Sequence, residues 1–270
     1  MKCDLHIHSD CSDGIFTPEQ IVETAKQKGL DCIALTDHDT VMGVDRAIAK
    51  GKEVGLKVLC GVEISTVAQC GDVHVLAFNM DTQHPAFAEE MKVISDFRRK
   101  RNEEMQKKFI QHGIDVDIFS LKKDGSIGRG DIARAMVKKG ICASTTEVFE
   151  KYLGAGKCCY VQTRRLTPAE AISFTLRFGG IPVLAHPKNL RMSQDDFEKF
   201  LKPLVLAGLG GIEAQYFAHN IRERKFFGKM AKKYKLIVTG GSDFHDYLHG
   251  LPLGEQSFSP DGYTKKVLGI

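Results

Sequence analysis

Seven short apolar runs recur along the 270 residues of the chain, and each of them ends in polar or charged side chains. In order, they read CDLHIH, DCIALTDHD, KVLCGVEIS, DVHVLAF, IPVLAHP, GGIEAQYF and LIVTGGSDFH. Runs this short and this rich in Val, Ile and Leu are typical of strands that are buried on both faces. Helical patterns lie between several of them, and this alternation implies a parallel sheet. The α/β fold that it favours most is a closed or nearly closed barrel.

Two of the intervening helices carry the same start signal. Residues 17–29 begin with Thr17 as N-cap, Pro18 at the first helical position and Gln20 completing a capping box, and residues 167–179 repeat this order. A third helix is amphipathic. Its predicted core face in residues 220–235 consists of Ile221, Phe226, Phe227, Met230 and Tyr234.

The strand pattern stops between about His84 and Cys159, where helical spacing replaces it. We therefore predict a first barrel segment in residues 1–83, an all-helical insert in residues 84–159 and a second barrel segment in residues 160–270. The insert contains the run RRKR at residues 98–101. We interpret this run as a solvated helix face, with contact to nucleic acid as the alternative.

Composition and charge exclude several classes of protein. The hydrophobic content of 43% and charged content of 27% are those of an ordinary globular chain, and the net charge of +4 fits an anionic substrate without demanding nucleic acid. The eight cysteines form no CxxC pair, and a disulfide between the neighbours Cys158 and Cys159 would be strained. We predict buried, reduced thiols and a cytoplasmic location. No signal-peptide pattern and no membrane-length apolar run is present.

Polar side chains gather where the predicted strands end, which is the functional end of an α/β barrel. These strand-end candidates are His6, His8, His38, Glu63, His74, His186, His219, Asp243 and His245. The remaining histidines, His84, His112 and His249, are predicted to lie on the surface or in loops.

The spacing of His6 and His8 is informative because alternate residues of a strand point to the same side. Many imidazoles and carboxylates on one rim would be costly to hold together without a cation. Imidazole with carboxylate and no thiolate suits zinc, manganese or iron. Because the candidates outnumber the ligands that one ion needs, a cluster of two or three ions is plausible.

The motifs DLHIHSDCSDG, ALTDHDT, GVEIS, HVLAF, LAHP and TGGSDFH, in this order, resemble those of the PHP (polymerase and histidinol phosphatase) family of metal-dependent phosphoesterases. The resemblance implies a distorted seven-stranded (βα)7 TIM-like barrel with up to three metal ions at the strand ends. It implies that His6, His8, Glu63 and Asp243 bind one ion. Glu63 would bridge to a second ion with His74 and His186, and Asp13, His38 and His245 would hold a third. Asp10 is the alternative to Asp13, but the family pattern favours the Asp of SDG.

Within that family, the chain is more similar to the subgroup that acts on AMP and 3′,5′-nucleoside bisphosphates, whose relatives include a 5′→3′ exoribonuclease. The subgroup carries a helical insert in the same place, which implies that residues 84–159 act as a substrate cap. Its motifs GRPH and GKPAYV correspond here to GRGD and GKCCYV, so Arg129 and Lys157 would bind phosphate. Gly130 and Asp131 replace Pro and His, and an acid there would weaken anion binding.

The resemblance implies a phosphomonoesterase in which a hydroxide held by the metal cluster attacks phosphorus. His219 would contact the substrate phosphate or transfer a proton. The predicted partner is a small phosphorylated substrate, with no membrane and no obligate protein partner. Alternatives are an exonuclease on short RNA or DNA, a phosphatase of the histidinol phosphate type and a non-catalytic metal or nucleotide sensor.

Overall fold

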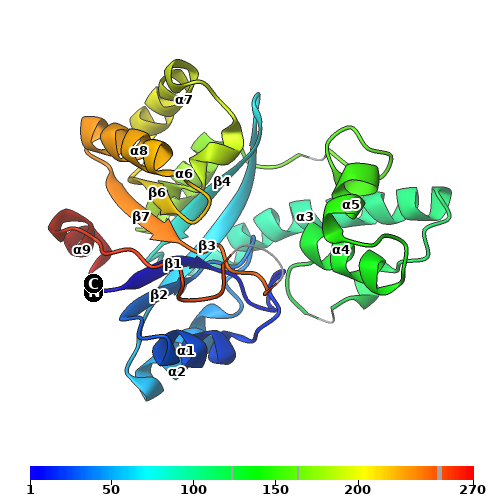
Figure 1. Cartoon of the computed structure of the whole chain (residues 1–270), viewed down its shortest axis with the longest axis horizontal. Helices are drawn as coiled ribbons and strands as arrows, with labels where there is room; N and C mark the ends of the chain where they lie inside the picture. The colour runs from blue at the N-terminus through cyan, green and yellow to red at the C-terminus, as the bar shows by residue number, and fades with distance from the viewer. Residues whose placement is uncertain (123, 163, 248–250) are drawn as a thin grey trace.

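The computed structural model describes residues 1–122, 124–162, 164–247 and 251–270. In these residues seven strands form one sheet in chain order (Figure 1). The strands are β1 (Cys3–Ile7), β2 (Cys32–Leu35), β3 (Lys57–Ala68), β4 (Gly71–Phe78), β5 (Ile181–Leu184), β6 (Gly211–Tyr216) and β7 (Ile237–Gly241). This arrangement confirms the predicted α/β barrel.

The barrel is nearly closed by contacts between its first and last strands. The carboxylate of Asp4 in β1 accepts hydrogen bonds from the backbone N–H (2.9 Å) and the hydroxyl (2.6 Å) of Ser242, just after β7. One residue beyond β1, the N–H of His8 donates to the carbonyl of Phe244 at 2.9 Å. Burial of Asp4 raises its pKa to about 7 despite these hydrogen bonds. These contacts therefore hold the ends of β1 and β7, which carry predicted metal ligands, next to each other.

The prediction of an all-parallel sheet is wrong for one strand. β4 runs antiparallel to both β3 and β5, whereas the other neighbouring strands are parallel. β3 continues to Ala68, and only Gln69 and Cys70 separate it from Gly71 at the start of β4. A parallel return needs a crossover of a dozen or more residues, so a link this short can form only a hairpin.

In the described residues, six α-helices lie around the barrel outside the predicted insert (Figure 1). They are α1 (Pro18–Gln27), α2 (Val44–Val54), α6 (Pro168–Arg177), α7 (Gln194–Leu206), α8 (Ile221–Tyr234) and α9 (Gly262–Leu268), with the short helix η3 (Pro187–Leu190). The capping boxes at Thr17 and Thr167 are both present. In α8, Phe227 and Met230 are buried as predicted, but Ile221 is 73% exposed. Ile221 is the first residue of the helix and lies outside the face that packs on the sheet.

Between β4 and α6 the described elements are all helical: α3 (Phe87–Gln111), η1 (Ile118–Ser120), α4 (Arg129–Lys138), α5 (Thr145–Val148) and η2 (Phe149–Leu153). Met91 and Ile94 of α3 pack in the core of the barrel, whereas Met105 and Phe109 pack in a separate core with α4 and η2. Figure 1 shows α3 leading from the barrel to α4 and α5 at its side. The domain boundaries stay a prediction, because α3 serves both cores. Among the described helices, none has the length and apolar character that crossing a membrane requires.

Candidate metal centre

The structure brings all nine predicted metal ligands to one end of the barrel. Their atoms form overlapping groups, and within each group the ligand atoms lie within 4.8 Å of one another. The groups are His6, His8, Glu63 and Asp243; His8, Asp13, His38 and His245; and His38, Glu63 and His74. His186 joins the cluster through Glu63, since its Nε2 atom lies 2.9 Å from Glu63 Oε1.

Glu63 lies at the middle of this cluster and is 1% exposed. Its Oε1 atom is 2.7 Å from His74 Nδ1, whereas its Oε2 atom is 3.1 Å from His38 Nδ1 and 3.2 Å from His6 Nε2. Burial opposes ionisation of this carboxyl, but the surrounding imidazoles, His38 first, hold its pKa well below its usual range. Each oxygen therefore faces a different set of imidazoles, which is the arrangement that a bridging carboxylate needs.

The first group also includes Asp243, whose Oδ1 atom lies 3.1 Å from His8 Nε2 and 3.3 Å from His6 Nε2. Asp243 has a φ of 52°, in the left-handed region that non-glycine residues rarely adopt. Such strain persists at functional sites when the surrounding structure fixes it. Here the hydroxyl of Tyr216 donates a hydrogen bond to Asp243 Oδ2 at 3.0 Å and orients the carboxylate.

The structure places Asp13, rather than Asp10, in the third predicted set. Asp13 Oδ1 lies 3.2 Å from His245 Nε2 and 3.9 Å from His38 Nε2. Burial opposes protonation of His245, but Asp13 raises its pKa to about 10. The carboxylate of Asp10 is absent from every group of neighbouring ligand atoms in the described residues.

Buried polar atoms without a hydrogen-bond partner at the centre fit a resident cation. In the part of the chain that the structure describes, eight buried side-chain atoms lack a hydrogen-bond partner, and five of them belong to the predicted ligands. Those five are His6 Nε2, His8 Nδ1, Asp13 Oδ1, His38 Nδ1 and Glu63 Oε2. Ligand bonds of about 2.0–2.2 Å place neighbouring ligand atoms between roughly 2.8 Å apart, in an octahedral site, and roughly 3.6 Å apart, in a tetrahedral one. The nitrogen–oxygen separations of 3.1–3.3 Å around Glu63 Oε2 and Asp243 Oδ1 match that spacing.

Glu213 in β6 supports the centre from outside. Its Oε1 atom lies 3.0 Å from His6 Nδ1, which leaves the other ring nitrogen of His6 for a metal ion. A carboxylate behind a ligating histidine fixes the ring and its tautomer. Glu213 was not among the predicted site residues, although a glutamate inside an apolar strand is itself a signal of a buried functional group.

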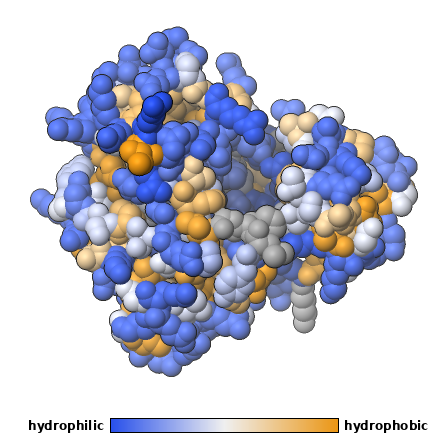
Figure 2. Space-filling view, viewed as in Figure 1, coloured by the Kyte–Doolittle hydropathy of each residue, from blue (hydrophilic) through white to orange (hydrophobic). Residues whose placement is uncertain are grey.

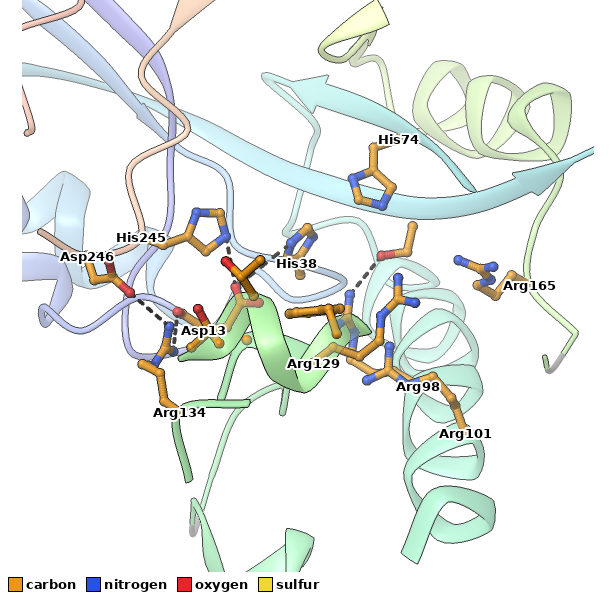
Figure 3. A pocket seen from close by; sticks show the side chains of 15 residues that line it. Asp13, His38, His74, Arg98, Arg101, Arg129, Arg134, Arg165, His245 and Asp246 are labelled. Atoms are coloured by element: carbon orange, nitrogen blue, oxygen red, sulfur yellow. Dashed lines mark hydrogen bonds and ion pairs between the residues drawn. The ribbon is translucent and has the colours of Figure 1, made fainter. Parts of the chain in front are cut away.

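A cavity of about 340 Å³ opens beside the centre. Figure 2 shows a hollow bordered mainly by hydrophilic residues between the barrel and the helices α4 and α5. In the close view of Figure 3, histidines of the centre lie on one side of the cavity and arginines on the other. The arginines that line it are Arg98, Arg101, Arg129, Arg134 and Arg165.

Carboxylates form ion pairs with several of these arginines, and one of these carboxylates is shared by two arginines. Asp72 pairs with both Arg129 Nη2, at 2.7 Å, and Arg165 Nη2. Burial would raise the pKa of Asp72, but the two arginines hold it below its usual range. One carboxylate between two guanidinium groups leaves positive charge directed at the cavity, which favours an anionic ligand.

The interpretation of RRKR as a solvated helix face is wrong for half of the run. Arg98 is 9% exposed, with its Nε atom donating to Asp39 Oδ2 at 2.8 Å, and Arg101 also lines the cavity. Arg99 and Lys100 are exposed as predicted. Residues three apart share a helix face, so this spacing was the available signal for Arg98 and Arg101.

The two residues predicted to bind phosphate differ in their position relative to the cavity. Arg129 lines the cavity, but Lys157 is exposed, and the cavity lining among the described residues does not include it. Asp131, predicted to weaken anion binding, turns back to the start of α4 and is not among the described residues that line the cavity. Its Oδ2 atom accepts from the N–H of Gly128 at 3.0 Å, and its Oδ1 atom lies 2.9 Å from Arg134 Nη2.

His219 is 4% exposed and lies behind Tyr216 rather than in the cavity lining that the structure describes. Its Nδ1 atom lies 3.1 Å from the carbonyl oxygen of Ala214, and burial lowers the pKa of the ring. This position does not support the predicted contact with substrate phosphate. His249, which is predicted to lie on the surface or in a loop, falls outside the described residues.

We therefore expect His219→Ala to act mainly on stability. The variant should lower the free energy of unfolding by about 1–3 kcal/mol, because it leaves space in a packed region, while kcat falls less than about tenfold. Denaturant unfolding and phosphate release measured on the same preparation test this prediction. If the variant is folded but its kcat is more than 100-fold lower, His219 has a catalytic role after all.

The comparisons with known proteins agree with this geometry. A family model described as PHP domain matches residues 4–154. A 5′-3′ exoribonuclease of Haemophilus influenzae is 32% identical over 256 residues, covering 94% of this chain and 93% of its own. A 3′,5′-nucleoside bisphosphate phosphatase of Chromobacterium violaceum is 32% identical over 246 residues, covering 90% and 86%.

A solved structure from Bifidobacterium adolescentis, assigned provisionally as a metal-dependent phosphoesterase, superposes with a TM-score of 0.88 at 29% identity. The superposition covers 99% of this chain and 95% of that one. One assignment follows from the barrel, from the cluster of imidazoles and carboxylates, and from these similarities. The chain belongs to the PHP domain family and is a metal-dependent phosphoesterase.

Proposed function

We propose that this phosphoesterase removes phosphate from small nucleotides, either AMP or 3′,5′-nucleoside bisphosphates. The observation that carries the proposal is the arginine-lined cavity beside the metal centre, because it offers several guanidinium groups to an anion of limited size. Its volume of about 340 Å³ lies at the small end of the range for small-molecule sites.

The nine residues predicted from the sequence would hold two or three divalent ions, which are zinc, manganese or iron by ligand type. When bound, such ions supply charge neutralisation for the phosphoryl group and activate water. The ligands would divide as the family resemblance implies, with Glu63 shared between two ions. Glu213 and Tyr216 hold His6 and Asp243 in the orientations that this division needs.

The protein's own contribution to catalysis is to bind and orient the phosphate ester. Arg129 and Arg134 reach the cavity from α4, and Arg134 also donates a hydrogen bond to the backbone carbonyl of Asp13 in the centre. A guanidinium group can donate two parallel hydrogen bonds to a phosphate and thereby fix its orientation. Held in this way, the ester presents its phosphorus to the metal centre.

The other side chains of the cavity suit a nucleoside. Phe149 lines it together with the hydroxyl-bearing residues Thr145 and Thr146. A phenyl ring can stack on a base of any sequence, and hydroxyl groups can hydrogen-bond to ribose or base. The helical insert, residues 84–159, supplies all three residues, which supports its proposed role as a substrate cap.

A 5′→3′ exonuclease is the second candidate, favoured by the similarity to the Haemophilus influenzae exoribonuclease. Both substrates present a terminal nucleotide to the same cavity. They differ in whether a phosphomonoester or a phosphodiester is cleaved. A panel of AMP, a 3′,5′-nucleoside bisphosphate, a 5′-phosphorylated trinucleotide and histidinol phosphate separates them by their kcat/KM values. Equal rates on all four esters would contradict nucleotide specificity.

Arg129→Met should lower kcat/KM for AMP by about 10- to 100-fold, because one charged hydrogen-bonding group contributes about 1.5–3 kcal/mol. The change should appear mainly in KM. Arg177→Met is the matched control, since Arg177 is an exposed arginine that pairs with Glu90 away from the cavity. A change of less than threefold in Arg129→Met, or an equal loss in the control, would contradict the proposed phosphate contact.

A further inference from the structure

A second cluster of metal-ligating side chains lies in the helical insert and shares no residue with the predicted centre. It consists of His112, Cys158 and Cys159. One ring nitrogen of His112 and the two sulfur atoms all lie within 4.8 Å of one another. We propose that these three side chains form a separate binding site for a soft or borderline divalent cation such as zinc.

The sulfur geometry supports this proposal. The Sγ atoms of Cys158 and Cys159 are 3.7 Å apart. Two thiolates bound to a tetrahedral zinc ion at about 2.3 Å would stand about 3.8 Å apart. The observed separation therefore allows both sulfurs to bind one ion with little rearrangement, whereas a disulfide needs about 2.05 Å.

The backbone around the two cysteines is held in place by hydrogen bonds. The N–H of Lys157 donates to the carbonyl of Gly154 at 3.0 Å, and the N–H of Cys159 donates to the carbonyl of Tyr152 at 3.0 Å. Lys108 of α3 donates from its Nζ atom to the carbonyl of Tyr160 at 2.7 Å. The loop is thus fixed against the last turns of α3 before any ion binds.

The same helix presents the histidine. His112 directly follows α3 and lies four residues after Lys108, so both side chains project from one face of the helix toward the loop. Cys159 is buried, whereas His112 and Cys158 are exposed. Three protein ligands with two of them exposed leave a fourth coordination position for water.

The chemistry of this cluster differs from that of the centre at the strand ends. Two thiolates and an imidazole favour zinc, cadmium or cobalt over manganese or magnesium, whereas the strand-end ligands contain no sulfur. Each thiol would lose its proton to solvent as the metal–sulfur bond forms, so binding should weaken as the pH falls. Burial and the neighbouring Cys158 raise the pKa of Cys159 to about 12, and a cation would offset this.

Titration of the reduced full-length protein with cobalt(II) tests the site. Cobalt also fills imidazole and carboxylate sites, but only thiolate ligands give sulfur-to-cobalt charge-transfer absorption, so the two centres are distinguishable. We expect this absorption to saturate near one equivalent and to be lost in Cys158→Ser. In His112→Ala the apparent Kd should rise at least tenfold. The matched control is Cys70→Ser, because Cys70 is an exposed cysteine in the link between β3 and β4.

Charge-transfer absorption that persists in Cys158→Ser, or that is unchanged in His112→Ala, would overturn the proposal. Alkylation gives a second readout that does not depend on cobalt. Zinc should slow alkylation of Cys158 by iodoacetamide at least tenfold while leaving Cys70 unaffected, as measured by peptide mass spectrometry. Equal alkylation of Cys158 with and without zinc would also overturn it.

Discussion

Replacing Glu63 by glutamine should reduce phosphate release from AMP by about 1,000-fold or more, because a bound ion provides several kcal/mol of transition-state stabilisation and each 1.36 kcal/mol corresponds to tenfold in rate. Glu63 is shared by two of the three predicted ligand sets, and its two oxygens face different imidazoles. Glutamine has nearly the same shape but carries no charge, and its nitrogen cannot bind a cation. The variant should also retain fewer metal ions per chain.

Glu213→Gln is the matched control for this prediction, since Glu213 is an equally buried glutamate that contacts His6 from behind. A residue that orients a ligand typically contributes about 10- to 100-fold in metal affinity or activity. The two variants should therefore differ by at least tenfold in kcat, measured with saturating metal. An effect of Glu213→Gln as large as that of Glu63→Gln, or full activity in Glu63→Gln, would contradict a bridging role.

The second large effect is expected on stability, from Arg98→Met. Arg98 is buried in α3, where its guanidinium contacts Asp39 Oδ2 at 2.7 Å and the hydroxyl of Ser65 at 2.7 Å. Methionine fills similar space but leaves Asp39 buried and without its cation, which costs about 3–5 kcal/mol of unfolding free energy. For a chain of this size that corresponds to a fall in Tm of roughly 5–9 °C.

Urea and thermal unfolding in the presence of a chelator isolate this effect from metal binding. Arg99→Met is the control, because Arg99 is the next residue of the same helix and forms exposed ion pairs with Asp96 and Glu103. Its loss should cost less than about 1 kcal/mol. Adding Asp39→Asn to Arg98→Met should restore part of the stability, since the unpaired charge is removed. Equal losses in the two arginine variants would show that the ion pair in the helix interior is not the cause.

The fold was largely predictable from the sequence because buried strands and helix starts have strong local signatures. The apolar runs located all seven strands, and the Thr-Pro signals at Thr17 and Thr167 located two helices. The direction of β4 was not predictable in this way. It depends on β3 continuing through the sequence STVA up to the turn, where the alternation of apolar and polar residues is weak and pairing with β4 decides that the strand forms.

The candidate ligands were also predictable, since histidines and carboxylates at strand ends are chemically rare and converge in space. The arginines of the cavity were not, because a charge run such as RRKR normally faces water. Only the packing of α3 against both cores turns Arg98 and Arg101 inward. Lys157 shows the converse: a motif places it in a substrate site, whereas the loop that carries it leaves its side chain exposed.

Elemental analysis tests the central claim of a multinuclear centre most directly. The protein should be purified without chelator, and the Cys158→Ser variant should be measured alongside it so that the site in the insert adds nothing to the count. The structure predicts two or three zinc, manganese or iron ions per chain in that variant, and a lower number in Glu63→Gln. One ion or fewer per chain, unchanged in Glu63→Gln, would contradict a metal cluster at the strand ends.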